Sequence, residues 1–197
     1  MTRLRADAAR SRDAILCAAR RIPRGELRLN DVAREAGVGV ATVYRHFPTV
    51  AALSEALSLD SIQRLRVLAG EAERTPDAGA ALHTLLAAAL ELQLADEGVQ
   101  AVITAPDAEL GAAREAKCAF VTSLRAALER AQVAGAVRPD ITVDHVRRML
   151  CGIEHAVRLG SPDDRPILLD VVLGGLRPAR AAEPSSSSSP TPQTAGS

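Results

Sequence analysis

The sequence predicts an all-α fold, and three of its features point that way. Apolar residues make up 47% of the chain but aromatic residues only 2%. Alanine and leucine, which lose least on entering a helix, supply much of the apolar content. Apolar residues also recur at helical spacing along most of the chain, and proline and glycine interrupt them as they do at helix ends.

Three short helices are predicted in the first fifty residues. The first spans about 6–22 and stops at Pro23, and the second, 29–36, ends at Gly37, where a left-handed residue closes a helix. Only two residues separate it from the third, 40–47. The stripe predicted to pack on the first two helices comprises Val40, Val43 and Phe47. The stripe predicted to face outward comprises Ala41, Thr42, Tyr44 and Arg45.

Longer helices are predicted in the rest of the chain. Thr49 is placed to cap a fourth helix that runs from about Val50 toward Glu73. Five more are expected at about 77–95, 99–104, 107–134, 143–159 and 163–176. From Ala181 onward serine, proline and threonine follow without periodicity, which predicts a disordered tail. The expected domains are a head at 1–50, a helical body at 51–178 and the tail at 179–197.

Composition limits the cellular setting. No signal-peptide pattern opens the chain and no run of about 18 apolar residues could span a bilayer, so we expect a cytoplasmic protein without a membrane partner. Cys17, Cys118 and Cys151 lie far apart in apolar, helical contexts. We interpret them as reduced core residues, in preference to redox sensors or metal ligands.

Charge is unevenly distributed along a chain whose formal net charge is zero. Residues 1–50 contain ten arginines against five acidic residues, whereas residues 51–197 contain 14 basic and 19 acidic residues. A basic head followed by an acidic remainder indicates that the head meets a polyanion.

The stretch GVGVATVYRHFPT, residues 37–49, gives that head a specific purpose. A helix, a glycine turn and a short second helix with an apolar back and a polar front form a helix-turn-helix. Such a helix fits the major groove of DNA, where tyrosine and arginine can donate to phosphate oxygens and arginine can also bridge two acceptors of guanine. Singly these would be ordinary surface residues, but together they predict DNA contact.

The segment LNDVAREAGVGVATVYRHFPTVAAL, residues 29–53, resembles the DNA-binding module of the TetR family of transcriptional regulators, with its pattern IA..AGVS.GTLY.HF. The matching positions are Val32, Ala33, Ala36, Gly37, Val38, Thr42, Tyr44, His46, Phe47 and Leu53. The resemblance implies a three-helix DNA-binding head and a larger helical body that dimerises through its last two long helices and usually encloses a small-ligand cavity.

Carried over by position, the resemblance puts Tyr44 and His46 against phosphates. It places four residues on or beside the groove-facing surface, namely Val40, Ala41, Thr42 and Arg45. Asn30 could hold a phosphate at the start of the second helix. Two positions depart from the pattern: Arg28 replaces the usual Ser or Thr, and Val50 replaces a usual cation. The expected DNA-contacting set therefore also includes Arg28, which could substitute for the missing cation, and Thr49.

The body offers weaker signals for a site. His83 and His155 lie on apolar helices, either as satisfied core histidines or as polar residues of a ligand cavity. The candidate ligand-binding residues are His83, Thr104, Arg125 and His155. Histidine, cysteine and acidic residues show no metal-ligand spacing, so no metal and no cofactor are expected. Any cavity should be lined mainly by aliphatic side chains.

Two apolar stripes near the end of the body predict a homodimer. The first comprises Val146, Met149, Leu150, Ile153 and Val157, and the second comprises Leu168, Leu169, Val172 and Leu176. Repeated by a two-fold axis, two such helices give a four-helix interface. The alternative is that both stripes serve only the core of a monomer.

These observations predict a dimeric transcriptional regulator, most simply a repressor, that binds a palindromic operator in double-stranded DNA and is released by a small-molecule effector. No nucleophile with a base, phosphate-binding glycine loop or catalytic carboxylate pair is evident, so we expect no enzyme and no catalytic residues. The alternative is a helical protein-interaction module without specific DNA binding, which a weaker dependence on salt would distinguish.

Overall fold

A computed structural model describes residues 2–178 of the chain. Within this range the chain forms helices and no strand, which confirms the predicted all-α fold. The α-helices are α1 (Thr2–Ala19), α2 (Leu29–Ala36), α3 (Val40–His46), α4 (Val50–Arg74), α5 (Ala78–Ala95), α6 (Glu97–Thr104), α7 (Gly111–Val133), α8 (Val143–Leu159) and α9 (Arg165–Gly175). Two short 3-10 helices are η1 (Arg24–Glu26) and η2 (Pro162–Asp164). The predicted tail at 179–197 lies outside the described residues.

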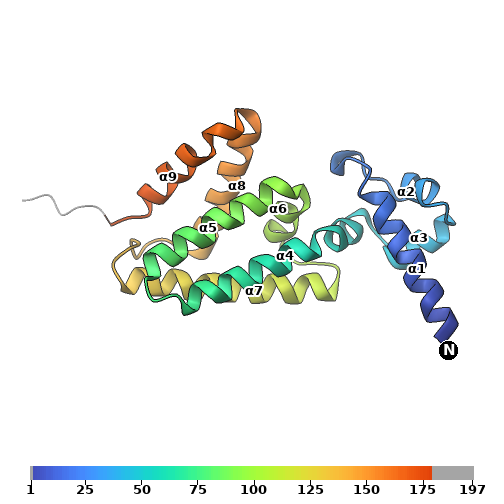
Figure 1. Cartoon of the computed structure of the whole chain (residues 1–197), viewed down its shortest axis with the longest axis horizontal. Coiled ribbons are helices and arrows are strands. Elements are labelled where there is room, and N and C mark those ends of the chain that lie inside the picture. Colours follow the sequence, from blue (N-terminus) through green and yellow to red (C-terminus); the bar gives the residue numbers. More distant parts are fainter. Residues whose placement is uncertain (1, 179–197) are drawn as a thin grey trace, which may run out of the picture.

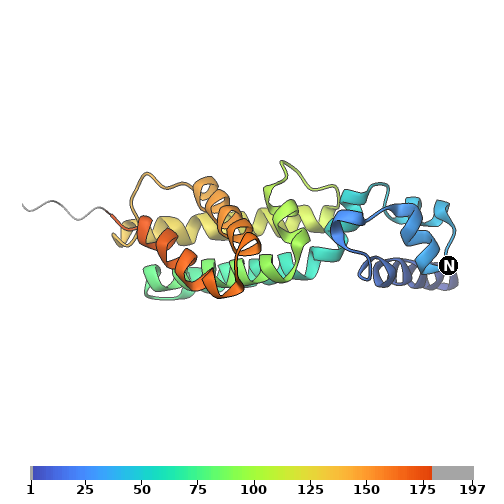
Figure 2. The same ribbon diagram turned by 90° about the horizontal axis from the view of Figure 1, so that it is seen from above.

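The helices are arranged as a small head and a longer body (Figure 1). The head consists of α1, α2 and α3 at one end of the molecule. Helices α4 and α7 lie side by side along the body, with α5 and α6 beside them, while α8 and α9 form its outer edge (Figures 1 and 2). The DNA-facing helix predicted from the sequence is therefore far from the end of α9.

Helix α4 connects two hydrophobic cores. Its first turns contribute Leu53 and Leu57 to the core of the head, and its later turns contribute Ile62 and Leu65 to the core of the body. One continuous helix is therefore packed into both cores. The head core thus extends beyond residue 50.

Most helix boundaries agree with the sequence pattern. Helix α2 spans the predicted residues, Gly37 follows it with a φ of 64°, and α3 ends one residue before the predicted Phe47. The Thr49 side chain accepts a hydrogen bond from the Ala52 N–H at 3.0 Å, so the predicted cap of α4 is confirmed. Local signals of this kind lie within a few residues of the boundary that they set.

Several boundaries differ: α1 begins at Thr2 rather than near residue 6, α6 at Glu97 rather than near residue 99, and α9 at Arg165 rather than near residue 163. Two other differences have a physical reason. Helix α1 ends at Ala19 rather than near Ile22, because the Ile22 N–H donates to the Ala19 carbonyl and tightens the chain before Pro23. Helix α7 begins at Gly111 rather than near Asp107. There the buried carboxylate of Glu55 accepts the N–H groups of residues 109 and 110 at 2.8 and 2.7 Å and holds them outside the helix.

Helix α5 corrects one expectation. By length and composition it could cross a membrane, although no such segment was expected. The structure packs it against α4, α6, α7 and α8, and Leu82, Leu85 and Leu90 are at most 2% exposed. The central helix of a helical bundle meets the same composition criterion as a membrane span.

Candidate nucleic-acid interface and effector groove

Helix α3 is fixed to the head by its apolar back. Val43 is fully buried, and Phe47 is 1% exposed. The Arg12 guanidinium lies 5.5 Å from the centre of the Phe47 ring, within the range of a cation–π interaction. Gly37 takes the left-handed conformation that lets the chain leave α2 and begin α3 three residues later. These contacts hold α3 in one orientation.

The opposite face of α3 is open to solvent. Tyr44 is 48% exposed, the largest polar side chain on this face. Its neighbours are Ala41 and Arg45, which are exposed, and Thr42 and His46, which are half-buried. The predicted outward stripe is therefore confirmed as a surface, and it presents a phenol and a guanidinium side by side.

Val40 does not pack in the head core as its place on the apolar stripe predicted. It is 44% exposed, whereas Val43, one turn later, is fully buried. The reason is position: Val40 is the first residue of α3 and lies before the helix reaches the core. Val40 instead extends the exposed face that Tyr44 occupies.

The starts of α2 and α4 supply further candidate contacts. Arg28 and Asn30 are both exposed, and Arg28 forms no side-chain cap. The first N–H groups of α2 are therefore left without a side-chain partner, and such groups can bind an anion. Val50, at the start of α4, is 39% exposed and carries no charge.

Several arginines of the head form ion pairs within the chain, so their charge is less available to bind DNA. Arg21 pairs with Glu35 at 2.9 Å and Arg34 with Asp31 at 2.7 Å. Among the described residues, Arg28 and Arg45 form no ion pair. The two arginines predicted to meet DNA, Arg28 and Arg45, thus keep their charge uncompensated by a carboxylate of the described chain, as Arg12 and Arg20 also do.

The structure gives Thr49 a role different from DNA contact. Its hydroxyl accepts the Ala52 N–H and donates to the Glu109 carboxylate of the body. The hydroxyl therefore acts as both donor and acceptor within the chain, and the negatively charged Glu109 carboxylate lies next to it. Thr49 thus joins the head to the body.

Asp96, between α5 and α6, forms the second connection between head and body. Its Oδ1 accepts from the Ser58 hydroxyl at 2.9 Å, from Arg24 at 3.2 Å and from the Gly98 N–H at 3.1 Å. Its Oδ2 accepts from the Ser61 hydroxyl at 2.8 Å. The sequence around Asp96 gives no indication of these partners from α4 and η1, because they lie far away in the chain.

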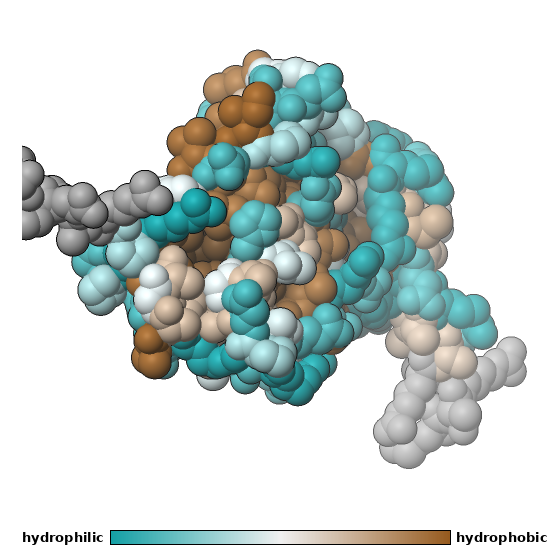
Figure 3. All heavy atoms as spheres, turned by 60° about the vertical axis from the view of Figure 1, so that its left-hand side comes forward, coloured by the Kyte–Doolittle hydropathy of each residue, from teal (hydrophilic) through white to brown (hydrophobic). Residues whose placement is uncertain are grey.

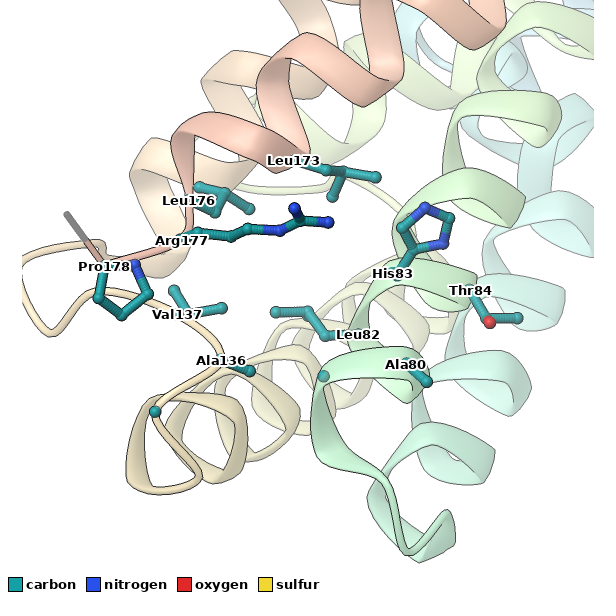
Figure 4. A pocket seen from close by; sticks show the side chains of 12 residues that line it. Ala80, Leu82, His83, Thr84, Ala136, Val137, Leu173, Leu176, Arg177 and Pro178 are labelled. Carbon is teal, nitrogen blue, oxygen red and sulfur yellow. The ribbon is translucent and has the colours of Figure 1, made fainter. Parts of the chain in front are cut away.

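A groove of about 570 Å³ lies in the body between α5, the turn after α7 and the end of α9 (Figure 4). Leu82, Val137, Leu173 and Leu176 supply apolar lining. The volume lies within the usual range for small-molecule sites, and an aliphatic lining with few polar groups matches the expectation from the sequence.

Two side chains that can carry positive charge line opposite walls of this groove. His83 projects from α5, and Arg177 extends from the other wall toward it (Figure 4). No hydrogen bond or ion pair within the described chain engages either side chain. Arg177 was missed by sequence reasoning, because only the fold brings the end of α9 opposite α5.

The four predicted ligand-binding residues do not converge. His83 lies in the groove, Thr104 lines separate hollows near α8, and Arg125 and His155 line none of the hollows found in the described residues. His83 and His155 are both exposed, so their interpretation as core histidines is wrong. Each lies on a helix with one apolar face, and periodicity over a short window did not show that the helix also has an open side.

The predicted dimer stripes are divided between the inside and the outside of the body. Five of the nine residues are buried in the chain's own core: Val146, Leu150, Ile153, Val157 and Leu176. The other four are half-buried: Met149, Leu168, Leu169 and Val172. The exposed apolar residues of this region are Leu159 at 76%, Ile167 at 66% and Val171 at 67%. Figure 3 shows hydrophobic residues gathered on this side of the body.

The cysteines and acidic residues give no second site. Cys17 and Cys118 are exposed and Cys151 is intermediate, so Cys17 and Cys118 are not the core residues that were expected. Within residues 2–178 no group of three or more histidine, cysteine or acidic side chains could hold a metal ion.

Two protein-family models match the chain. One, described as bacterial regulatory proteins of the tetR family, covers residues 25–57. The other, described as the C-terminal domain of SbtR-like transcriptional regulators, covers residues 76–178. Together they span the head interface and the body that contains the groove. The chain has no match among curated proteins.

Solved structures of transcriptional regulators are also similar to this chain. A TetR transcriptional regulator from Streptomyces coelicolor is 33% identical over 85% of this chain and 98% of its own, with a TM-score of 0.51. A TetR transcription regulatory protein from Mycobacterium vanbaalenii is 32% identical over 88% and 99%, with a TM-score of 0.47. FadR from Bacillus subtilis, crystallised in complex with stearoyl-CoA, shares the fold at 16% identity over 85% and 94%, with a TM-score of 0.51.

Proposed function

The chain belongs to the TetR family of transcriptional regulators, and from this premise we propose that it is a dimeric repressor that a small-molecule effector releases from its operator. DNA-binding transcription regulation is common to the family. Repression, dimerisation and release by an effector are the steps that we add. The observation that carries the proposal is the exposed Tyr44–Arg45 face of α3, held on a rigid apolar back.

The proposed DNA contacts follow from exposure and charge. Tyr44, His46 and Asn30 would meet phosphates, and Arg28 would replace the cation that Val50 lacks. The residues proposed to face the major groove are Val40, Ala41, Thr42 and Arg45. Thr49 is left out of this set, because its hydroxyl is engaged by Ala52 and Glu109. Residues 1–50 form the proposed DNA-binding domain and 51–178 the body.

We propose that two copies associate through the outer sides of α8 and α9. Ile167 and Val171 are exposed there, and Leu168 and Val172 are only half-buried within one chain. Burial of these side chains against a second copy removes apolar surface from water, and a two-fold axis would place the same patch on both subunits. Two heads related by that axis fit a palindromic operator with one half-site each.

The proposed effector site is the groove that contains His83 and Arg177. Its lining suits a small apolar or amphipathic molecule. Binding there would change the separation of the two heads, so that they no longer fit adjacent segments of the major groove. Coupling of this kind between two sites is typically worth about 1 to 3 kcal/mol. The protein is proposed to act in the cytoplasm and without enzymatic activity.

The test is fluorescence anisotropy of the full chain with its own upstream DNA and with a scrambled duplex. We expect the native duplex to bind more tightly, the affinity to fall steeply between about 50 and 200 mM salt, and Tyr44→Ala to weaken binding by about tenfold. Arg66→Ala, an exposed arginine of α4 in the body, is the matched control and should bind as the wild type does.

Two outcomes would contradict the proposal. If neither duplex binds at the lowest salt, the head does not read DNA and the protein-interaction alternative replaces it. If Tyr44→Ala and Arg66→Ala behave alike, the DNA contact does not run through α3. Addition of an effector should weaken the binding of the native duplex.

A further inference from the structure

A second concave region lies on the body, apart from the groove of Figure 4, at the C-terminal end of α6. Here α6 meets α7 and α8, and two hollows of about 370 and 330 Å³ share Thr104 and Arg147 in their linings. Lys117 of α7 and Arg148 of α8 complete the basic side chains of this region, which is called the α6 cleft below.

The α6 cleft contains a buried lysine without a carboxylate partner. Lys117 is 8% exposed, and its ammonium donates to the Ala105 carbonyl. Within the described residues no acidic side chain forms an ion pair with it. Buried lysines are rare unless paired, so the missing anion requires an explanation.

Arg147 brings a second positive charge to the same place. One of its terminal nitrogens donates to the Ile103 carbonyl, and the other pairs with the exposed Asp144 at 2.9 Å. Its Nε is buried and has no partner in the described chain. An N–H group that is buried and unpaired costs free energy, and an acceptor at this position would recover it.

The acidic groups near Lys117 are engaged elsewhere. Asp107 pairs with Arg114 at 2.9 Å, and Glu55 accepts two backbone N–H groups. Burial lowers the pKa of Lys117 and the neighbouring Arg147 lowers it further, against smaller opposing effects of Asp107, Cys118 and Glu55. Burial and Arg147 together outweigh these groups, so the charged form of Lys117 is disfavoured overall.

The end of α6 accounts for only part of this charge. The carbonyls of Ile103 and Ala105, which accept from Arg147 and Lys117, belong to the last turn and the C-cap of α6. A helix C-terminus carries roughly half a negative charge, whereas the two side chains can bring two positive ones. Asp144, which lines the smaller hollow and pairs with Arg147, compensates one further charge, so Lys117, Arg147 and Arg148 together still leave a surplus of positive charge in the cleft.

We propose that the α6 cleft binds an oxyanion, a carboxylate or a phosphate, attached to a short apolar group. Lys117 and Arg147 would hold the oxyanion, and the apolar group would lie on Pro106 and Val121, which line the larger hollow. The hydroxyl of Thr104 donates to the Gln100 carbonyl and that of Thr122 to the Cys118 carbonyl, so the basic residues select the charge. The site is separate from the groove proposed for the effector.

Isothermal titration of the full chain with three probes of equal alkyl tail length tests the proposal: octanoate, heptyl phosphate and the neutral octanamide. At least one anionic probe should bind at least tenfold more tightly than octanamide, and comparison of the two identifies the preferred oxyanion. Lys117→Met keeps the aliphatic stem and should reduce the affinity for that anion to the level of octanamide. Arg148→Met changes an exposed position and should reduce the affinity for the same anion by a smaller factor. This variant keeps the test valid if Lys117→Met does not fold.

Cysteine alkylation locates the bound probe. Cys118 lines the larger hollow and Cys17 is exposed on α1, so the tighter anionic probe should slow alkylation of Cys118 several-fold and leave Cys17 unchanged. Equal affinity for all three probes would overturn the proposal, as would binding that leaves Cys118 unprotected or is unaffected by the substitutions. Because binding is measured without DNA, failure here and failure of the proposed repressor function are separate results.

Discussion

Gly98 of α6 lies close against Ser58 of α4, and replacing it with alanine tests how tightly the two helices are packed. A Cβ at this position would lie 2.3 Å from the Ser58 Oγ, whereas ordinary contacts begin at 3.4 Å. Ser58 is fully buried, and its hydroxyl donates to Asp96 at 2.9 Å. In Gly98→Ala the hydroxyl must therefore rotate away from its acceptor, or the two helices must separate.

The expected cost follows from these contacts. A buried hydroxyl that loses its acceptor costs about 1 to 3 kcal/mol, and alanine in place of glycine in a helix returns about 0.5 to 1 kcal/mol. Gly98→Ala should therefore destabilise the fold by about 1 to 2 kcal/mol. Ser58→Ala alone should cost about 1 kcal/mol, because Asp96 keeps its bonds with Arg24, Ser61 and the Gly98 N–H.

The double variant provides the decisive measurement. Ser58→Ala removes the atom that obstructs the new Cβ, so Gly98→Ala should be neutral or stabilising in that background. The coupling free energy between the two substitutions should then be about 1 to 2 kcal/mol in favour of the pair. Urea unfolding of the four proteins, followed by far-UV circular dichroism, gives this value. Additive effects, or a double variant less stable than Gly98→Ala, would refute the close contact.

Two further predictions concern single polar contacts. Thr49→Ala should lower the free energy of unfolding by about 1 kcal/mol through loss of the α4 cap, whereas Thr49→Ser should retain most of it, as urea unfolding would reveal; equal losses would mean that the hydroxyl is not the capping group. The pKa of Asp140 is held below its ordinary 3.8 chiefly by its hydrogen bond with Arg138, so stability present above pH 4 should decline as pH falls through the depressed value. NMR titration should find this pKa raised toward 3.8 in Arg138→Gln, and an unchanged value would exclude the ion pair as its cause.

The head could be predicted from the sequence because its determinants are local. Gly37, Thr49 and the alternation of buried and exposed residues on α3 act within one or two helical turns. Periodicity therefore identified both the face that packs and the face that Tyr44 occupies. On α3, periodicity wrongly predicted that Val40 is buried. Val40 is the first residue of the helix, where the apolar spacing continues but the head core no longer lies against the helix.

Contacts between segments far apart in the chain could not be predicted in the same way. Within the body, Glu55 accepts the N–H groups of Glu109 and Leu110, which follow it by 54 and 55 positions. Between head and body, Arg24 donates to Asp96 across 72 positions. No spacing in the sequence encodes such pairs, because the fold alone brings them together. The start of α7 was misplaced for the same reason, since a distant carboxylate decides where that helix begins.

Helix periodicity also does not determine whether an apolar stripe packs in the chain's own core or lies on the surface. Val146 and Ile153 lie on a stripe that α8 turns toward its own body, whereas Ile167 and Val171 of α9 face outward. Both patterns satisfy the same spacing rule. Only the three-dimensional packing distinguishes a core stripe from a surface available to a second copy.

Asp96 and Arg24 explain how the start of α6 can influence the head. Their side chains are 15% and 23% exposed, so the pair is more strongly coupled than one in open solvent. It is the one ion pair between residues 6–50 and 51–178 among the described side chains. Because the same carboxylate caps α6 and binds Ser58 of α4, α6 cannot shift at this end without either breaking the bond with Arg24 or carrying η1 and the head with it.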